Sequence, residues 1–123
     1  MIAESKKPQL QAILVMDSRR ISLVLRQQNF TGAWSQLYKA GDFYPDLSLK
    51  PDAHKAYLQG YIVADPSQLG SIQGTTSLYN EQTQLSTPIG VTGSFRLEVP
   101  QGGEYQLEIA LQHQVIRLDS IQI

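Results

Sequence analysis

Two histidines are the first residues of this chain that could take part in catalysis. His54 lies in the turn-like stretch PDAHK, and His113 lies between two glutamines in LQHQ. A catalytic histidine needs a nucleophile or a carboxylate held at hydrogen-bond distance. Neither stretch suggests such a partner, and the chain has no cysteine to serve as a thiol nucleophile. The sequence therefore predicts no catalytic residues and a protein that is not an enzyme.

Oxygen ligands for a metal ion are spread thinly along the chain. Asp42, Asp46 and Asp52 lie near one another, but the alternating ligands, central glycine and terminal glutamate of a calcium loop are absent. The GVTG stretch at residues 90–93 lacks the lysine and the strand-to-helix setting of a phosphate-binding loop. We expect no metal site and no cofactor, and we interpret the three aspartates as turn residues.

Aromatic side chains are the strongest candidates for a binding site. Four of them cluster in sequence and two more follow, namely Trp34, Tyr38, Phe43 and Tyr44, then Tyr57 and Tyr61. Exposed aromatic rings on a β-sandwich would suit stacking against a carbohydrate or contact with a protein partner. The alternative is a small core in which the same rings pack beneath a helix.

A short helix is expected over residues 30–41, FTGAWSQLYKAG. Its large apolar residues, Phe30, Trp34, Leu37 and Tyr38, recur at helical spacing. Gly41 is placed to end the helix. Such a set is more often core than binding site. We therefore expect Trp34 to be buried, with a loop over residues 42–51 that contains at most a short strand at 47–49.

Alternating apolar residues predict β-structure in the rest of the chain. Residues 93–111, GSFRLEVPQGGEYQLEIAL, read as a hairpin with one buried face. At least one of Gly102 and Gly103 should have a positive φ in its turn. Residues 57–65 are apolar on both faces, as a central strand is. Pro88 favours an edge strand, and the slip in alternation near Arg117 predicts a β-bulge.

The N-terminal third is interpreted as an addition to this β-structure. Residues 1–8 form a flexible arm, and residues 9–28 form a second hairpin whose two apolar faces need cover from the sheet or from another chain. The sequence thus predicts an all-β domain over residues 9–123, with a core at 57–123 and a hairpin-plus-helix extension at 9–50. The expected architecture is an antiparallel β-sandwich with an extra N-terminal β-hairpin and one short helix.

Composition narrows the class of partner. The chain has 123 residues, a net charge of −1 and scattered basic residues, which argues against nucleic-acid binding. The longest apolar run, residues 12–16, is far too short for a membrane span. No signal-peptide pattern opens the sequence. A cytoplasmic protein remains an alternative, but we favour a virion protein or the mature fragment of an exported one.

Three stretches of the sequence follow a known pattern: Leu58-Gln59-Gly60-Tyr61-Ile62-Val63-Ala64-Asp65, Gly93-Ser94-Phe95 and the turn from Pro100 to Tyr105. Through these stretches, residues 58–111 resemble the carboxypeptidase-regulatory-like, transthyretin-like β-sandwich domains. The turn departs from the family in having two glycines, and Thr92 stands where an Asp or Asn usually precedes the glycine. The resemblance implies an Ig-like or transthyretin-like antiparallel β-sandwich and a non-catalytic module that positions, binds or stabilises another component.

These observations favour a structural or protein-binding component of a larger assembly, such as a bacterial surface, secretion, pilus or phage assembly, and we expect either a protein partner or self-assembly of the chain. The two apolar faces near residues 12–25 need cover, and the surface is rich in glutamine and poor in charge, as interface cores are. The strand-like end at residues 121–123 could pair with another chain. The alternative is a carbohydrate-binding module that uses the aromatic residues between Trp34 and Tyr44.

Overall fold

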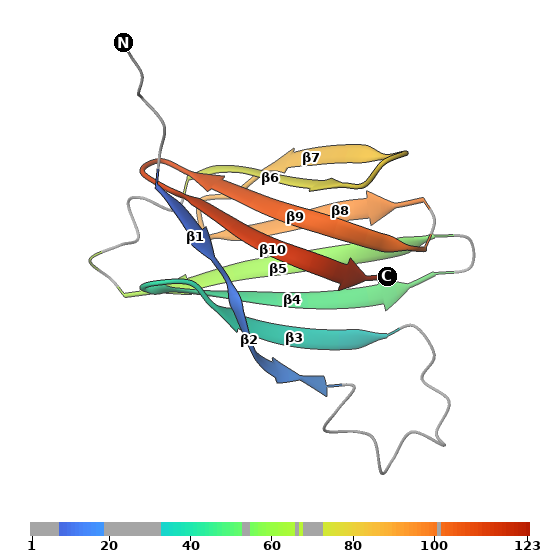
Figure 1. Ribbon diagram of the computed structural model, residues 1–123, viewed down its shortest axis with the longest axis horizontal. Helices are drawn as coiled ribbons and strands as arrows, with labels where there is room; N and C mark the ends of the chain where they lie inside the picture. Colours follow the sequence, from blue (N-terminus) through green and yellow to red (C-terminus); the bar gives the residue numbers. More distant parts are fainter. Residues whose placement is uncertain (1–7, 19–32, 53–54, 66, 68–72, 101) are drawn as a thin grey trace.

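The described residues fold into two β-sheets that pack face to face (Figure 1). The computed structural model describes residues 8–18, 33–52, 55–65, 67, 73–100 and 102–123. The first sheet has the order β1–β10–β9–β6–β7, with β1 Gln9–Gln11, β10 Val115–Gln122, β9 Glu104–Leu111, β6 Gly74–Tyr79 and β7 Gln84–Pro88. The second sheet has the order β2–β3–β4–β5–β8, with β2 Ile13–Asp17, β3 Trp34–Lys39, β4 Phe43–Pro51, β5 Ala56–Ala64 and β8 Ser94–Val99. The predicted all-β sandwich is confirmed.

Several expected strand positions are also confirmed. β5 lies between β4 and β8, as its apolar composition predicted, and β7, which ends at Pro88, is an edge strand. The register between β9 and β10 shifts between Leu118 and Ile121, where Ser120 has a φ of 60°. The bulge therefore exists, slightly further along the chain than the slip near Arg117 suggested.

The first two strands form a single segment that passes from one sheet to the other. β1 pairs in parallel with β10, and β2 pairs antiparallel with β3. Between them, Ala12 donates its N–H to the carbonyl of Arg117 at 2.9 Å. Residues 9–17 therefore join both main sheets, as the need for cover predicted. The second half of the expected hairpin lies outside the described residues.

Residues 93–111 do not form a hairpin, which corrects the sequence-based prediction. β8 pairs with β5 in the second sheet, whereas β9 pairs with β10 and β6 in the first, so the chain crosses the sandwich between them. The predicted inward face is nevertheless buried, with every member at most 6% exposed: Phe95, Leu97, Val99, Tyr105, Leu107 and Ile109. The alternation of apolar residues identifies the buried face of each strand. It does not distinguish two strands paired in one sheet from two strands that face each other in different sheets.

The turn after β8 is tied to the end of the chain. Gly103 has a φ of 147°, which confirms the positive φ expected at this glycine pair. Its N–H and carbonyl both bond to Ile123, each at 2.9 Å. The C-terminal residue therefore pairs within the chain, and its backbone is not free to pair with another chain.

The expected helix over residues 30–41 is wrong, because residues 34–39 form β3. Trp34, Gln36 and Tyr38 alternate toward the core, and Gly41, with a φ of 61°, turns the chain into β4. Gln36 hid this alternation, since a polar residue at a core position leaves the remaining apolar residues at helical spacing. The loop expected over residues 42–51 is likewise wrong, because residues 43–51 form β4, in which Pro45 takes a buried inward position between Phe43 and Leu47.

The buried Gln36 is satisfied by hydrogen bonds, which explains why the fold tolerates it. The hydroxyl of Tyr38 donates to Oε1 of Gln36 at 2.8 Å, and Nε2 of Gln36 donates to Oδ2 of Asp17 at 3.1 Å. Burial of an amide costs little when its donors and acceptors are paired in this way. The network links β2 to β3 beneath the outer surface of the second sheet.

Candidate functional site

The residues that could have supported catalysis or metal binding are not brought together. His113 is exposed in the turn between β9 and β10, and His54 lies outside the described residues. Asp42 lies in the β3–β4 turn, Asp52 lies at the end of β4, and Asp46 lies in the middle of that strand rather than in a turn. In the part of the chain that the structure describes, no three His, Asp or Glu side chains are grouped to hold a metal ion.

The four aromatic candidates divide between core and surface. Trp34, Tyr38 and Phe43 are buried in the sandwich, with exposures of 6%, 6% and 1%. Tyr44 follows Phe43 on β4 and therefore points to the opposite side, where it is 38% exposed. The burial expected for Trp34 is confirmed, although a strand and not a helix places it there. A binding surface made from these four residues is therefore reduced to Tyr44.

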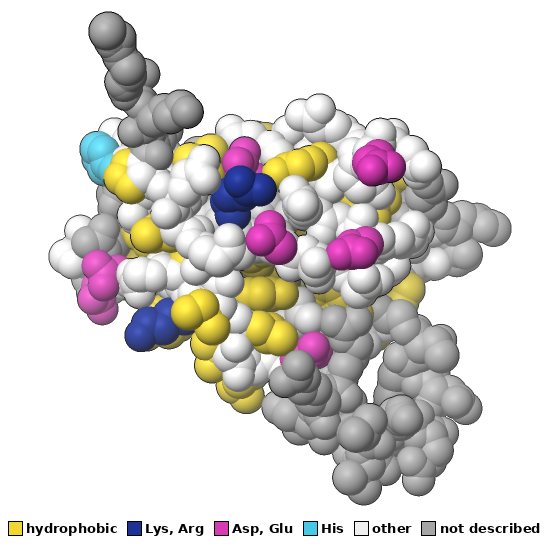
Figure 2. Space-filling view, in the orientation of Figure 1, with side chains coloured by type: hydrophobic (Ala, Val, Ile, Leu, Met, Phe, Trp, Pro, Cys, Tyr) yellow, Lys and Arg dark blue, Asp and Glu magenta, His cyan; other side chains and the backbone are white. Residues whose placement is uncertain are grey.

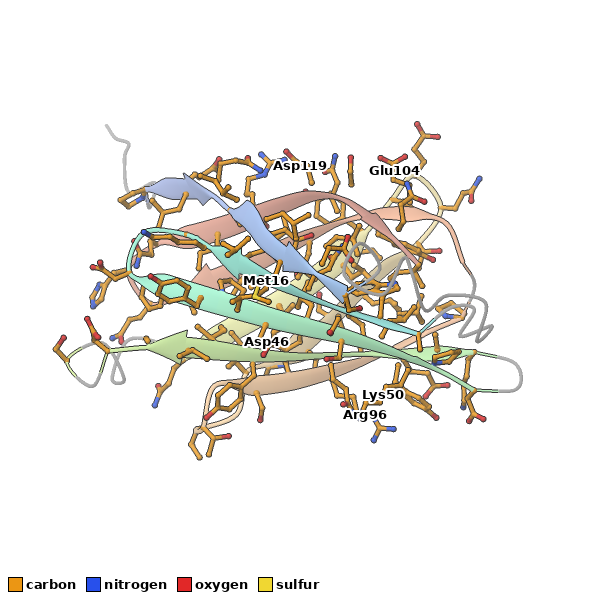
Figure 3. The ribbon with its side chains drawn as sticks, turned by 90° about the horizontal axis from the view of Figure 1, so that it is seen from below. Met16, Asp46, Lys50, Arg96, Glu104 and Asp119 are labelled. Atoms are coloured by element: carbon orange, nitrogen blue, oxygen red, sulfur yellow. The ribbon has the colours of Figure 1, made fainter. Side chains whose placement is uncertain are left out.

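Apolar side chains gather instead on the outer surface of the second sheet. Ile13 on β2 is 67% exposed, and Tyr61 and Val63 on β5 are 48% and 44% exposed. We call this surface the apolar face and define it by Ile13, Met16, Leu37, Tyr44, Tyr61 and Val63. Figure 3 looks onto it with Met16 and Asp46 near the middle, and Figure 2 shows hydrophobic side chains gathered around β2 at the lower edge of the molecule.

Strand register makes the apolar face continuous from β2 to β5. Met16 lies opposite Leu37, Leu37 opposite Asp46, and Asp46 opposite Tyr61. In the neighbouring row of outward-facing residues, Ile13 lies opposite Lys39, and Tyr44 lies opposite Val63. Because directly opposite residues in an antiparallel sheet touch one another, these side chains form two adjoining rows across four strands.

Two charged residues stand inside the apolar face. Lys39 and Asp46 are both exposed, and they lie diagonally across the β3–β4 pair. The ammonium of Lys39 lies 6.0 Å from the centre of the Tyr44 ring, close enough for a weak cation–π contact. Within the described ranges, neither residue has an ion-pair partner. The face therefore offers one positive and one negative charge surrounded by apolar side chains.

A polar hollow adjoins the apolar face on the side of β8. It has a volume of about 610 Å³ and opens widely to solvent. Tyr61 lines it together with six other side chains that can form hydrogen bonds, namely Asp46, Ser48, Gln59, Thr87, Ser94 and Arg96. A ring beside several donors and acceptors is suited to a small polar ligand with an apolar surface of its own.

At the other end of the outer surface of the second sheet, polar and charged side chains contact one another within the chain. The guanidinium of Arg96 lies 4.1 Å from the centre of the Tyr57 ring, and Nζ of Lys55 donates to Oε2 of Glu98 at 2.7 Å. This hydrogen bond, followed by one to Tyr57, raises the pKa of Lys55 above its ordinary value. These side chains therefore satisfy one another, in contrast to the two charges in the apolar face.

Comparison with known proteins does not identify a functional site in this chain. No family model, no curated protein and no solved structure matches the chain. No helix among the described residues is long and apolar enough to cross a membrane.

Sequence reasoning named Tyr44 and Tyr61 as binding candidates and the apolar faces near residues 12–25 as needing cover, but it did not join them into one surface. The stretch from residue 57 to 65 is apolar on both faces, and this was interpreted as the burial of a central strand. β5 is central within its sheet, but the sandwich covers only one of its faces, so Tyr61 and Val63 remain exposed. Two-faced apolar strands in a two-layer sandwich therefore indicate an exposed binding surface as well as a central position.

Proposed function

We propose that this chain is a non-catalytic, protein-binding component of a larger assembly and that it docks through the apolar face. The observation that carries the proposal is the exposure of large apolar side chains in two adjoining rows. Contiguous apolar surface of this kind marks interaction sites in soluble domains, whereas single exposed apolar residues need no explanation. The outer surface of the first sheet, in the part described, has no comparable set of exposed large apolar residues.

The family resemblance agrees with a docking role. The two strand motifs that resemble carboxypeptidase-regulatory-like, transthyretin-like domains fall on β5 and at the start of β8, which are neighbours. Gly60 of the first motif lies opposite Phe95 of the second. The motifs thus serve the packing of the second sheet, and a module of this class holds or positions another protein at a bacterial surface, in a secretion or pilus system, or in a virion.

A matched pair of valine substitutions tests this proposal. Val63 lies in the apolar face, whereas Val91, which is 87% exposed, lies in a turn outside it. The tagged chain is used to capture its partner from the native source, and the amount of each co-purifying protein is measured by mass spectrometry. Val63→Ser should lower the capture of a specific protein at least tenfold, and Val91→Ser should not. Equal capture by both variants would remove the apolar face from the proposal.

The polar hollow favours a second candidate function, which is carbohydrate binding. Its ring and its donors and acceptors combine the stacking and hydrogen bonding by which proteins hold sugars. Tyr61, rather than Trp34, would be the stacking residue. A glycan array tests this candidate: saturable binding that is lost in Gln59→Ala and kept in Gln84→Ala, which alters an exposed glutamine on β7, would support it.

A further inference from the structure

We propose that the partner on the apolar face is a second copy of this chain, bound about a two-fold axis with its own apolar face. This rests on the docking role proposed above and specifies the occupant. The argument comes from the two charges in the face, from the shape of the β2 edge and from the area of the sheet.

Lys39 and Asp46 together make the face electrostatically self-complementary. Their positions on β3 and β4 are diagonal neighbours, about 7–8 Å apart at Cα in such a pair. A purely apolar partner would have to cover both charges, and leaving them unpaired would cost more than burying apolar surface gains. A second copy supplies one aspartate and one lysine in the same relative arrangement. The two charges on each side then find opposite charges on the other.

A two-fold axis is required for both pairs to form at once. If the axis lies between the two sheets and crosses the line from Lys39 to Asp46 at its midpoint and at right angles, each lysine faces the partner's aspartate. Residue i then contacts j while j contacts i, which is the mark of an isologous interface. From strand spacings of about 4.8 Å and residue spacings of about 3.4 Å, this axis sets the strands of the two sheets at about 70°. That angle is close to the orthogonal class of sheet packing.

Pairing of β2 edges is the competing way to join two copies, and the structure disfavours it. The register of β2 on β3 shifts between Leu14 and Met16, so the edge strand carries a bulge. Bulges twist an edge away from regular pairing with another chain. The outer face of the second sheet, and not its β2 edge, therefore presents a regular surface to a second copy.

The area of the second sheet matches a modest dimer. Five strands at the usual spacing cover about 20 Å by about 25 Å, or about 500 Å² in projection, somewhat below the ~800 Å² per partner of a standard interface. Along one side of the apolar rows, Ser35, Ser48 and Gln59 form a polar row like part of the rim of known interfaces. We therefore expect a reversible dimer with a Kd in the micromolar range.

Charge reversal gives the test, with sedimentation velocity of the full chain as the measurement. The unchanged chain should pass from monomer to dimer between about 1 µM and about 1 mM. Lys39→Glu and Asp46→Lys should each raise the Kd at least tenfold, because each places like charges across the axis twice. An equimolar mixture of the two variants should form a heterodimer, and a chain carrying both changes should dimerise again. Asp119→Lys and Glu104→Lys, which reverse exposed charges on β10 and β9 of the first sheet, are the controls.

The outcomes separate the identity of the partner from the docking role itself. A chain that remains monomeric throughout this range, single reversals that leave the Kd unchanged, or a mixture that does not associate would each overturn the self-association. Loss of a captured protein in Val63→Ser while the chain is monomeric would keep the docking role and assign the face to a different protein. Unchanged emission from Trp34 in each variant shows that the fold is intact.

Discussion

Phe95 lies over Gly60, the residue directly opposite it on the neighbouring strand, and its ring occupies the space where a side chain of Gly60 would stand. At this point β5 and β8 contact each other through the ring of Phe95 and the backbone of Gly60, which has no side chain. The exposure of Phe95 is only 6%, so the ring has little room to move outward. Glycine within a strand often marks such a close approach.

Substitution of Gly60 by alanine should therefore destabilise the domain. The added Cβ would overlap the ring of Phe95, and overpacking of this kind costs about 1–3 kcal/mol. Urea unfolding followed by Trp34 fluorescence measures the change. Gly90→Ala is the control, since a Cβ there would meet its nearest atom at an ordinary 3.5 Å. Equal stability of the two variants would contradict the contact, whereas a smaller loss for Gly60→Ala in a Phe95→Leu background would support it.

Leu107 tests the burial of the inward face of β9. Its side chain is 1% exposed between the two sheets, so Leu107→Ala should lower the free energy of unfolding by about 2–5 kcal/mol. Val91→Ala, at an exposed position, should change it by less than about 0.5 kcal/mol. A loss below about 1 kcal/mol for Leu107→Ala would mean that this face is not core.

Trp34 is the only tryptophan, so the fluorescence of the chain reports one site. Because its side chain is 6% exposed, the emission of the folded protein should be blue-shifted and poorly quenched by iodide. Trp34→Ala should cost about 3–5 kcal/mol of stability, as the removal of a large buried aromatic does. Red-shifted, readily quenched emission in the native protein would place the indole at the surface and reopen a binding role for it.

The buried amide of Gln36 should make the Tyr38 hydroxyl important for stability. Tyr38→Phe removes the donor to Oε1 of Gln36, and a buried acceptor without its partner costs about 1–3 kcal/mol. Replacing both residues, as Tyr38→Phe with Gln36→Leu, should recover part of that loss because no unpaired amide remains. Thermal melts of the three variants provide the comparison. A double variant less stable than the sum of the two single losses would show that the network acts in another way.

The sequence by itself determined which class of structure this chain adopts and which residues enter its core. Alternation is a local property, because successive side chains of a strand point to opposite sides whatever the strand pairs with. For this reason the burial of Leu97 and Leu107, the edge position of Pro88 and the positive φ of Gly103 were all predictable. Where a polar residue took a core position, as Gln36 does, the local signal was lost and a strand was mistaken for a helix.

Only the tertiary structure decided which strands are neighbours and which apolar faces stay uncovered. β8 and β9 follow one another with matching alternation, yet they belong to different sheets. Tyr61 and Leu58 are both large and apolar on the same strand, but the opposing sheet covers Leu58 and leaves Tyr61 exposed. The physical reason is that pairing and cover are contacts between segments distant in sequence, so the local pattern of a strand does not specify its partner. The apolar face, with Lys39 and Asp46 inside it, exists only once β2, β3, β4 and β5 lie side by side.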